Sequence, residues 1–147
     1  ICEVEIDPPT GKVSFADYVV VEDVGTVLNQ DLVEGQMHGG IAQGIGQAIG
    51  EILRHDKTGQ LITGSFMDYQ MPVAADFPNF RISTIAIPTK INPLGAKGVG
   101  EAGTVGALAA TMNAVVDAMA CAGVTEFEMP ATAHRVWQAL EEAKQTS

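Results

Sequence analysis

The hydrophobic positions along this chain change their period several times, and each change predicts a new element. Residues 1–6 (ICEVEI) alternate apolar and acidic side chains, which is typical of a half-buried strand. After the turn DPPTGK, residues 13–22 continue as a second strand rich in Val, Phe and Tyr, so the pair predicts a hairpin. Further strands are predicted at 61–68, ending near Pro72, and at 80–87 (FRISTIAI).

From residue 31 to residue 55 the period becomes helical. One side of this helix carries isoleucines: Ile41, Ile45, Ile49 and Ile52. The opposite side alternates amides with bare backbone: Gln36, Gly40, Gln43, Gln47 and Gly50. Glycine in a helix interior costs about 1 kcal/mol relative to alanine, so something must pack closely here. Tight helix-on-sheet packing explains most of these glycines, whereas three buried amides would need partners such as a polar heterocycle or a phosphate-bearing cofactor.

The last third of the chain predicts two more helices. An Ala-rich run at 104–122 would be capped by Thr104 and stopped by Gly123. Thr132 would cap a terminal helix whose buried side is Val136, Trp137 and Leu140. Strands mixed with helices predict an α+β fold, and the length fits a single domain over 1–147. Because a strand pattern already begins at the first residue, we expect this domain to be a fragment of a larger subunit.

Composition narrows the class of partner. The net charge of −10 and the eight scattered basic residues argue against nucleic acid, because phosphate binding needs clustered Lys and Arg. We find no apolar run of membrane-spanning length. Cys2 and Cys121 lack CxxC spacing, and we interpret both as small buried hydrophobic residues. The histidines lack the spacing of metal ligands, which argues against a protein-ligated metal: His38, His55 and His134.

A glycine-rich stretch, residues 92–106 (NPLGAKGVGEAGTVG), sets one acidic residue among five glycines. Glycines at this density let the main chain approach a bulky ligand, and their N–H groups then become binding groups. Glu101 precedes the predicted helix, whose positive end favours an ionised carboxylate. A general base must be ionised before it can accept a proton, so Glu101 is a candidate for that role.

Two other interpretations of this stretch remain open. The glycines can simply form a turn that caps a helix, with Glu101 solvated. Alternatively, residues 98–103 match G-x-G-x-x-G, and Glu126 lies at the sequence distance of a ribose-binding acid. That fingerprint requires a buried strand directly upstream, whereas residues 88–97 carry two prolines and two lysines. The stretch is not a Walker loop, because no G-K-[ST] follows the glycines.

Three segments in order resemble one known family: VEDVGTVLN, then VEGQMHGGIAQGIGQA, then NPLGAKGVGEAGT. They are similar to the C-terminal part of the large subunit of the molybdenum hydroxylases, which include xanthine dehydrogenase, aldehyde oxidase and aerobic carbon monoxide dehydrogenase. GSFMDYQMP and MPATAHRVWQAL resemble the carbon-monoxide-dehydrogenase-like branch most. The resemblance spans nearly the whole chain and rests on two glycine-rich signatures with the family's separation.

The resemblance implies a molybdopterin-binding domain and a molybdenum-dependent oxidoreductase. The cofactor would be molybdopterin, in some members as its cytosine dinucleotide, and the protein would supply no molybdenum ligand. Glu101 matches the family's catalytic glutamate, which takes a proton from a hydroxyl group on the metal. Gln36 matches a glutamine that contacts the pterin. The remaining positions that match cofactor-binding residues are Gly39, Gly40, Lys97, Gly98, Val99 and Gly100.

The resemblance also implies partners. Iron–sulfur clusters and FAD are expected on other domains or subunits of a cytoplasmic enzyme, with the remainder of the large subunit closing the site. We expect the isolated chain to bind no cofactor, to be inactive, and to self-associate through exposed apolar surface. The alternatives are a non-catalytic assembly or binding module that keeps the fold, and a dinucleotide-binding domain.

Overall fold

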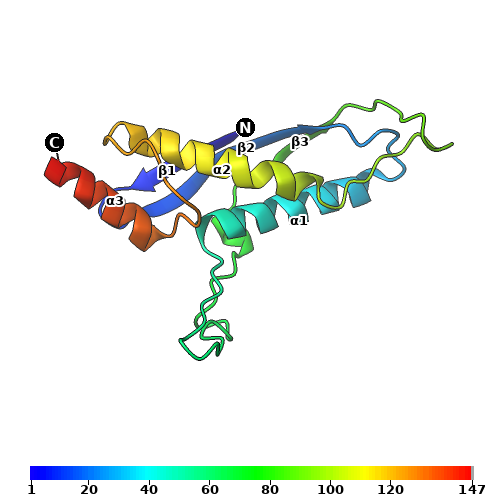
Figure 1. Ribbon diagram of the computed structural model, residues 1–147. Helices are drawn as coiled ribbons and strands as arrows, with labels where there is room; N and C mark the ends of the chain where they lie inside the picture. Colours follow the sequence, from blue (N-terminus) through cyan, green and yellow to red (C-terminus); the bar gives the residue numbers. More distant parts are fainter. Residues whose placement is uncertain (147) are drawn as a thin grey trace.

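The computed structural model describes residues 1–146 and shows one small sheet covered by helices, as Figure 1 illustrates. The strands are β1 (Cys2–Asp7), β2 (Lys12–Glu22) and β3 (Arg81–Thr84). The helices are α1 (Gln30–Ile49), α2 (Ala102–Ala120) and α3 (Ala133–Thr146), and a short 3-10 helix, η1, covers Ala74–Asp76. The predicted α+β fold is confirmed.

The sheet has the order β1-β2-β3. β1 and β2 are antiparallel and form the predicted hairpin, with Glu5 opposite Ser14 and one register shift between Glu3 and Val4. β3 runs parallel to β2, with Val19 opposite Arg81. β3 is shorter than the predicted strand at 80–87, because after Ile85 the chain leaves the sheet.

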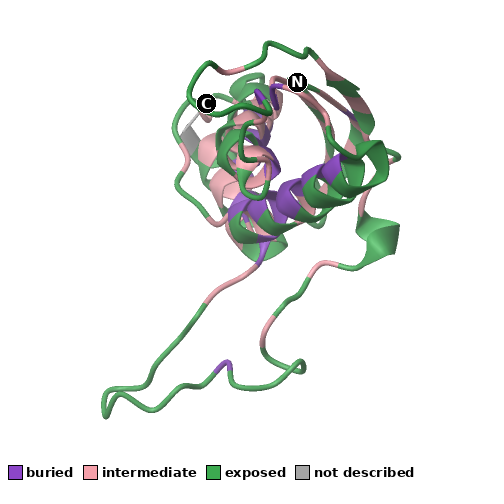
Figure 2. Ribbon diagram, turned by 90° about the vertical axis from the view of Figure 1, so that its right-hand side faces the viewer, coloured by how far each residue is buried: buried purple, intermediate pink, exposed green. Residues whose placement is uncertain are grey.

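The strand predicted at 61–68 is wrong. Residues 51–72 instead form an arm that extends away from the sheet and helices (Figures 1 and 2). The only pairing there among the described residues is an isolated bridge between His55 and Leu61. Asp56 builds the tip by accepting hydrogen bonds from the N–H groups of Thr58 and Gln60. The apolar residues of the arm have strand-like composition, but no neighbouring strand lies beside them.

Helix α1 ends six residues earlier than the predicted limit at residue 55. Asn29 caps its start by accepting a hydrogen bond from the N–H of Leu32 at 3.0 Å. At its end, the N–H groups of Gly50 and Glu51 both donate to the carbonyl of Gly46. Ile52 therefore lies outside the helix, whereas Ile41 and Ile45 are fully buried as predicted.

Two glycines of α1, Gly40 and Gly44, pack closely against α2 and not against the sheet. A β-carbon on Gly44 would lie 2.7 Å from that of Ala107, and one on Gly103 would lie 2.7 Å from the carbonyl oxygen of Met37. The two helices therefore meet backbone to backbone. The hydroxyl of Thr104 donates to the carbonyl of Gly40 at 3.0 Å, so Thr104 lies inside α2 and is not its cap.

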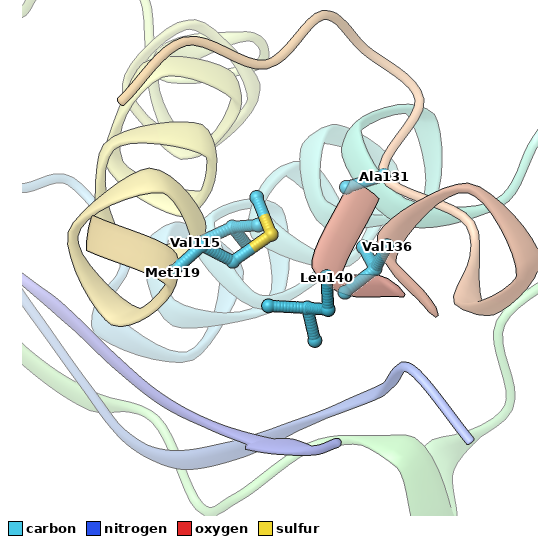
Figure 3. Packing of buried hydrophobic residues seen from close by; sticks show 5 residues of the cluster. All are labelled: Val115, Met119, Ala131, Val136 and Leu140. Atoms are coloured by element: carbon cyan, nitrogen blue, oxygen red, sulfur yellow. The ribbon is translucent and has the colours of Figure 1, made fainter. Parts of the chain in front are cut away.

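The C-terminal half of α2 and the N-terminal part of α3 share an apolar cluster, which also contacts the β1–β2 hairpin. Thr132 caps α3 as predicted, since its hydroxyl oxygen accepts a hydrogen bond from the N–H of Arg135 at 3.4 Å. Trp137 is 39% exposed, so its predicted burial is wrong. Cys121 is exposed and Cys2 is half-buried, so burial of both cysteines is also wrong. Figure 3 shows the buried residues of the cluster: Val115, Met119, Ala131, Val136 and Leu140.

One helix is long and apolar enough to cross a membrane by length and composition, which the sequence analysis did not anticipate. This helix is α2. Its buried residues, among them Ala107, Thr111 and Val115, lie in the protein core with α1 and the hairpin. Packing in the core therefore accounts for this buried face, while only 28% of the membrane-length window is buried.

Candidate functional site

Glu101 is the residue that immediately precedes α2. It is exposed, and its side chain does not cap the helix. Within residues 1–146 its carboxylate makes no hydrogen bond and no ion pair. Its position places it beside the N–H groups at the start of the helix. A charged carboxylate without a partner is available to accept a proton from a bound ligand.

The loop before Glu101 is anchored through residues 95–97, which pair with residues 24–26 after β2. The N–H of Lys97 donates to the carbonyl of Val24 at 2.9 Å, and the N–H of Thr26 donates to the carbonyl of Gly95 at 2.9 Å. Gly25 has φ 65°, and a β-carbon there would lie 2.3 Å from the carbonyl oxygen of Gly95. Glycine is therefore required at position 25 for this pairing.

The side chain of Lys97 points to Asp23 at the end of β2. Its Nζ atom donates to Oδ2 of Asp23 at 2.5 Å, and Oδ1 of Asp23 accepts from the N–H of Gly25 at 2.9 Å. The hydrogen bond from Lys97 is the main reason that the pKa of Asp23 lies below its usual value. The ammonium group and the backbone N–H of Lys97 are thus both paired within the chain.

Gln36 and the loop border one small hollow of about 180 Å³. The hollow lies between the start of α1 and residues 96–99, and Gln36 is exposed beside it. Most of the lining is apolar, and its polar side chains are Thr26, Asn29, Gln36 and Lys97. The apolar members are Val24, Leu28, Leu32, Val33, Ala96 and Val99.

Gln36 and Glu101 belong to the same end of the helix pair. Gly103, two residues after Glu101, contacts the backbone of Met37, which directly follows Gln36. The structure therefore brings together the two stretches that the sequence singled out.

Several glycines at this end face open space. A β-carbon on Gly39, Gly98 or Gly100 would meet no atom within 4 Å. None of the three has a positive φ, so backbone conformation does not require glycine there either. Gly40 differs, because it is buried and a β-carbon would lie 3.0 Å from the backbone nitrogen of Thr104. Packing between the helices explains Gly40 without a ligand.

The three amides of α1 are exposed, so the expectation of buried amides is wrong for this chain. Gln36, Gln43 and Gln47 all lie on the surface. Gln43 approaches the hydroxyl of Thr104 at 3.5 Å, at the limit of a hydrogen bond. Gln36 and Gln47 have no such neighbour among residues 1–146. The amides can donate hydrogen bonds to a ligand and accept them from it, but they do not require one, because they are exposed to solvent.

The dinucleotide interpretation does not fit the geometry. Glu126 follows the C-terminal end of α2, whereas the 98–103 loop lies at its N-terminal end. A helix of 19 residues rises 1.5 Å per residue, so the helix alone spans about 28 Å. Within the described chain, no strand directly precedes Gly98. The two features that a dinucleotide site needs are therefore missing together.

Asp23, within VEDVGTVLN, is a site residue that the motifs and the family resemblance did not indicate. The available signal was an aspartate at the end of a strand, two residues before a glycine, which is typical of a side chain that bonds the backbone of a following turn. The described residues hold no group of three or more His, Cys, Asp or Glu side chains suited to a metal ion.

Comparison with known proteins gives a consistent result. Residues 1–78 match the family model of the molybdopterin cofactor-binding domain. The chain is 39% identical to the carbon monoxide dehydrogenase large chain of Hydrogenophaga pseudoflava, over 97% of this chain and 18% of that protein. It is 44% identical to the nicotine 6-hydroxylase large subunit of Paenarthrobacter nicotinovorans, over 94% of this chain and 17% of that protein.

Solved structures agree with these relatives. A crystal structure of Cu,Mo-CO dehydrogenase matches 99% of this chain with a TM-score of 0.92 at 34% identity, and the match covers 18% of that chain. Quinoline 2-oxidoreductase from Pseudomonas putida 86 matches 95% of this chain with a TM-score of 0.90 at 42% identity. The chain therefore spans less than a fifth of the length of these relatives.

Proposed function

This chain belongs to the molybdopterin cofactor-binding family of molybdenum hydroxylase large subunits, and on that premise we propose that it carries the catalytic base and one wall of the cofactor site. The whole protein would be an oxidoreductase that inserts oxygen derived from water into a substrate carbon. Glu101 is the proposed base. The proposed wall consists of Gln36, Gly39 and the backbone of residues 97–100.

The observation that supports this proposal most is the open space at Gly39, Gly98 and Gly100. Neither positive φ nor a protein neighbour accounts for glycine at these positions. Gly39 also lies inside α1, where glycine costs about 1 kcal/mol relative to alanine. A large flat ligand held against the bare backbone gives all three glycines a purpose.

The residues present fit a pterin cofactor. The amide of Gln36 can both donate to and accept from a polar heterocycle. The N–H groups of Gly98, Val99 and Gly100 have no acceptor among the described residues, so they are available to a ligand. Because no His, Cys or acidic cluster is present in residues 1–146, the chain fits a metal that the cofactor itself ligates. The proposed form is molybdopterin or its cytosine dinucleotide.

The proposed role of Glu101 is to hold and move one proton. When bound, the cofactor supplies a molybdenum centre that accepts electrons from the substrate carbon. Glu101 accepts the proton of the attacking oxygen at a carboxylate oxygen. The exposure of the Glu101 side chain at the start of α2 leaves its oxygen atoms free to reach the proton.

The proposed partners are the rest of the large subunit and subunits that carry iron–sulfur clusters and FAD. The arm, residues 51–72, presents large apolar side chains to solvent, and Phe66 and Met67 are 82% and 94% exposed. Exposed apolar surface of this kind marks contact regions. We therefore expect the isolated chain to self-associate, to hold no molybdenum and to be inactive.

The test is Glu101→Gln in the full-length enzyme. The amide fills the same volume but cannot accept the proton, so turnover should fall about 10²- to 10⁴-fold while molybdenum content stays at the wild-type value. Glu126→Gln is the matched control, since Glu126 is also an exposed glutamate but lies beyond the far end of α2. It should keep full turnover.

Two results would contradict the proposal. Wild-type turnover of molybdenum-loaded Glu101→Gln would remove the base assignment. A folded full-length complex that never takes up molybdenum would favour a non-catalytic assembly or binding module that keeps the fold.

A further inference from the structure

The loop that carries Glu101 runs between two fixed points, the paired residues 95–97 and the start of α2. Lys97 is held by its N–H and by its ammonium group. From Gly98 to Glu101, the described residues show no backbone N–H that donates a hydrogen bond; the next donor is Ala102, to Val99 at 3.3 Å. Lys97 is therefore the last residue before Glu101 whose N–H is hydrogen-bonded within the chain. Its position sets where the segment that ends at Glu101 begins.

Asp23 joins three separate segments at this anchor. Its Oδ2 atom accepts from Lys97, and its Oδ1 atom accepts from the N–H of Gly25 at 2.9 Å and of Ile87 at 3.2 Å. The three partners belong to the loop, to the turn after β2 and to the segment after β3. One carboxylate thus couples the Glu101 loop to the edge of the sheet.

We propose that Asp23 and Lys97 form a clasp that positions Glu101 for proton transfer. Both are positioning residues, since neither is proposed to touch the reacting atoms through its side chain. This inference rests on the proposed function and adds to it the residues that set where the base lies. Misplacement of a catalytic group by about 1 Å can cost about 10²-fold in rate, so a mobile loop would lower kcat even with the cofactor in place.

The clasp predicts which substitutions are tolerated. Lys97→Arg keeps a cation that can reach Asp23, so kcat should fall far less than in Lys97→Met. Lys97→Met removes the cation and keeps most of the chain length, so kcat should fall roughly 10- to 100-fold. Asp23→Asn keeps an oxygen for the backbone N–H groups but loses its charge, and kcat should fall by a similar factor. The loss should appear in kcat rather than in KM when the variants are compared at equal molybdenum content.

The experiment is a double-mutant cycle in the full-length enzyme. It compares wild type, Asp23→Asn, Lys97→Met and the double variant at equal molybdenum content. The double variant should be no slower than the slower single variant, because either change already opens the clasp. Asp17→Asn is the matched control: Asp17 pairs with Arg81 between β2 and β3, its side chain is 29% exposed against 30% for Asp23, and it is remote from the loop. Its kcat should be unchanged.

The outcomes separate this inference from the proposed function. If Glu101→Gln, run in parallel, is inactive while Asp23→Asn and Lys97→Met keep wild-type kcat, the clasp is wrong and the base assignment stands. Multiplicative effects in the double variant, or losses that follow molybdenum content alone, would also overturn the clasp. If Glu101→Gln keeps its turnover, the proposed function itself fails, whatever the clasp variants show.

Discussion

Gly40 and Gly98 come from the two glycine-rich stretches that first drew attention, yet their surroundings differ. At Gly40 a β-carbon would lie 3.0 Å from a backbone atom of α2, whereas at Gly98 it would meet nothing within 4 Å. Gly44 and Gly103 resemble the first case, and Gly39 and Gly100 resemble the second. Glycine therefore serves two purposes within one small region of the molecule.

The two groups of glycines have different explanations: the fold requires the first group, and we assign the second group to ligand binding. Packed glycines are explained by the chain itself, since α1 and α2 approach so closely that a methyl group would not fit. The glycines with open space have no such explanation within residues 1–146. These glycines lower the stability of the chain without making a contact within it, as expected where a surface binds another molecule. The proposals above rest on this second group.

The largest effect is expected at the packed glycines. Gly103→Ala would place a methyl group 2.7 Å from the carbonyl oxygen of Met37 and 2.9 Å from the nitrogen of Ile41. Both are backbone atoms, so the helices must separate, and overpacking of this kind costs about 1–3 kcal/mol. We expect the free energy of unfolding to fall by about 2 kcal/mol in urea titrations followed by circular dichroism.

Gly106→Ala is the control for this prediction. Gly106 lies in the same helix three residues later, and a β-carbon there would meet no atom within 4 Å. It should gain stability by up to about 1 kcal/mol, because alanine is the better helix former. Equal effects at the two positions would mean that the close helix contact is not what requires Gly103.

A smaller effect of opposite sign is expected at the open glycines. Gly39→Ala should raise the free energy of unfolding of the chain by up to about 1 kcal/mol, because the helix gains and nothing collides. In the full-length enzyme the same change should lower the molybdenum content per subunit, since the added methyl group occupies the proposed cofactor wall. Elemental analysis measures this. Undiminished molybdenum would remove Gly39 from the wall.

Local patterns in the sequence predicted the parts of the fold that local physics decides. The alternation of ICEVEI and the turn after it fixed the β1–β2 hairpin, and the spacing of Ile41 and Ile45 fixed the buried face of α1. The arm escaped prediction, because 61–68 has strand-like composition but pairs with no neighbouring strand. The burial of Trp137 was wrong for a similar reason: helical spacing gives a face but not what covers it.

The site could be predicted only in part. Glycine density pointed to both 35–50 and 92–106, but the sequence cannot say which glycines meet protein, since that depends on how α1 and α2 cross. Asp23 lies 74 residues from Lys97, so no local pattern could pair them. The roles of Glu101 and Gln36 came from the family resemblance, and they stay predictions.

The smallest effect is expected on lowering the pH, and it should affect only the loop that carries Glu101. The contact between α1 and α2 depends on van der Waals packing, whereas the position of the loop depends partly on the charge of Asp23. Its folded pKa lies below the ordinary value of 3.8, chiefly because of Lys97, so its stabilising effect is present above 3.8 and is lost as the pH falls through the folded pKa. Hydrogen exchange measures this directly. The protection factor of the Lys97 amide should fall below about pH 4, while that of Gly44 should not change over the same interval. In Asp23→Asn the Lys97 amide should already exchange faster at neutral pH and lose this acid dependence, and parallel losses at both amides would mean that acid loosens the helix pair instead.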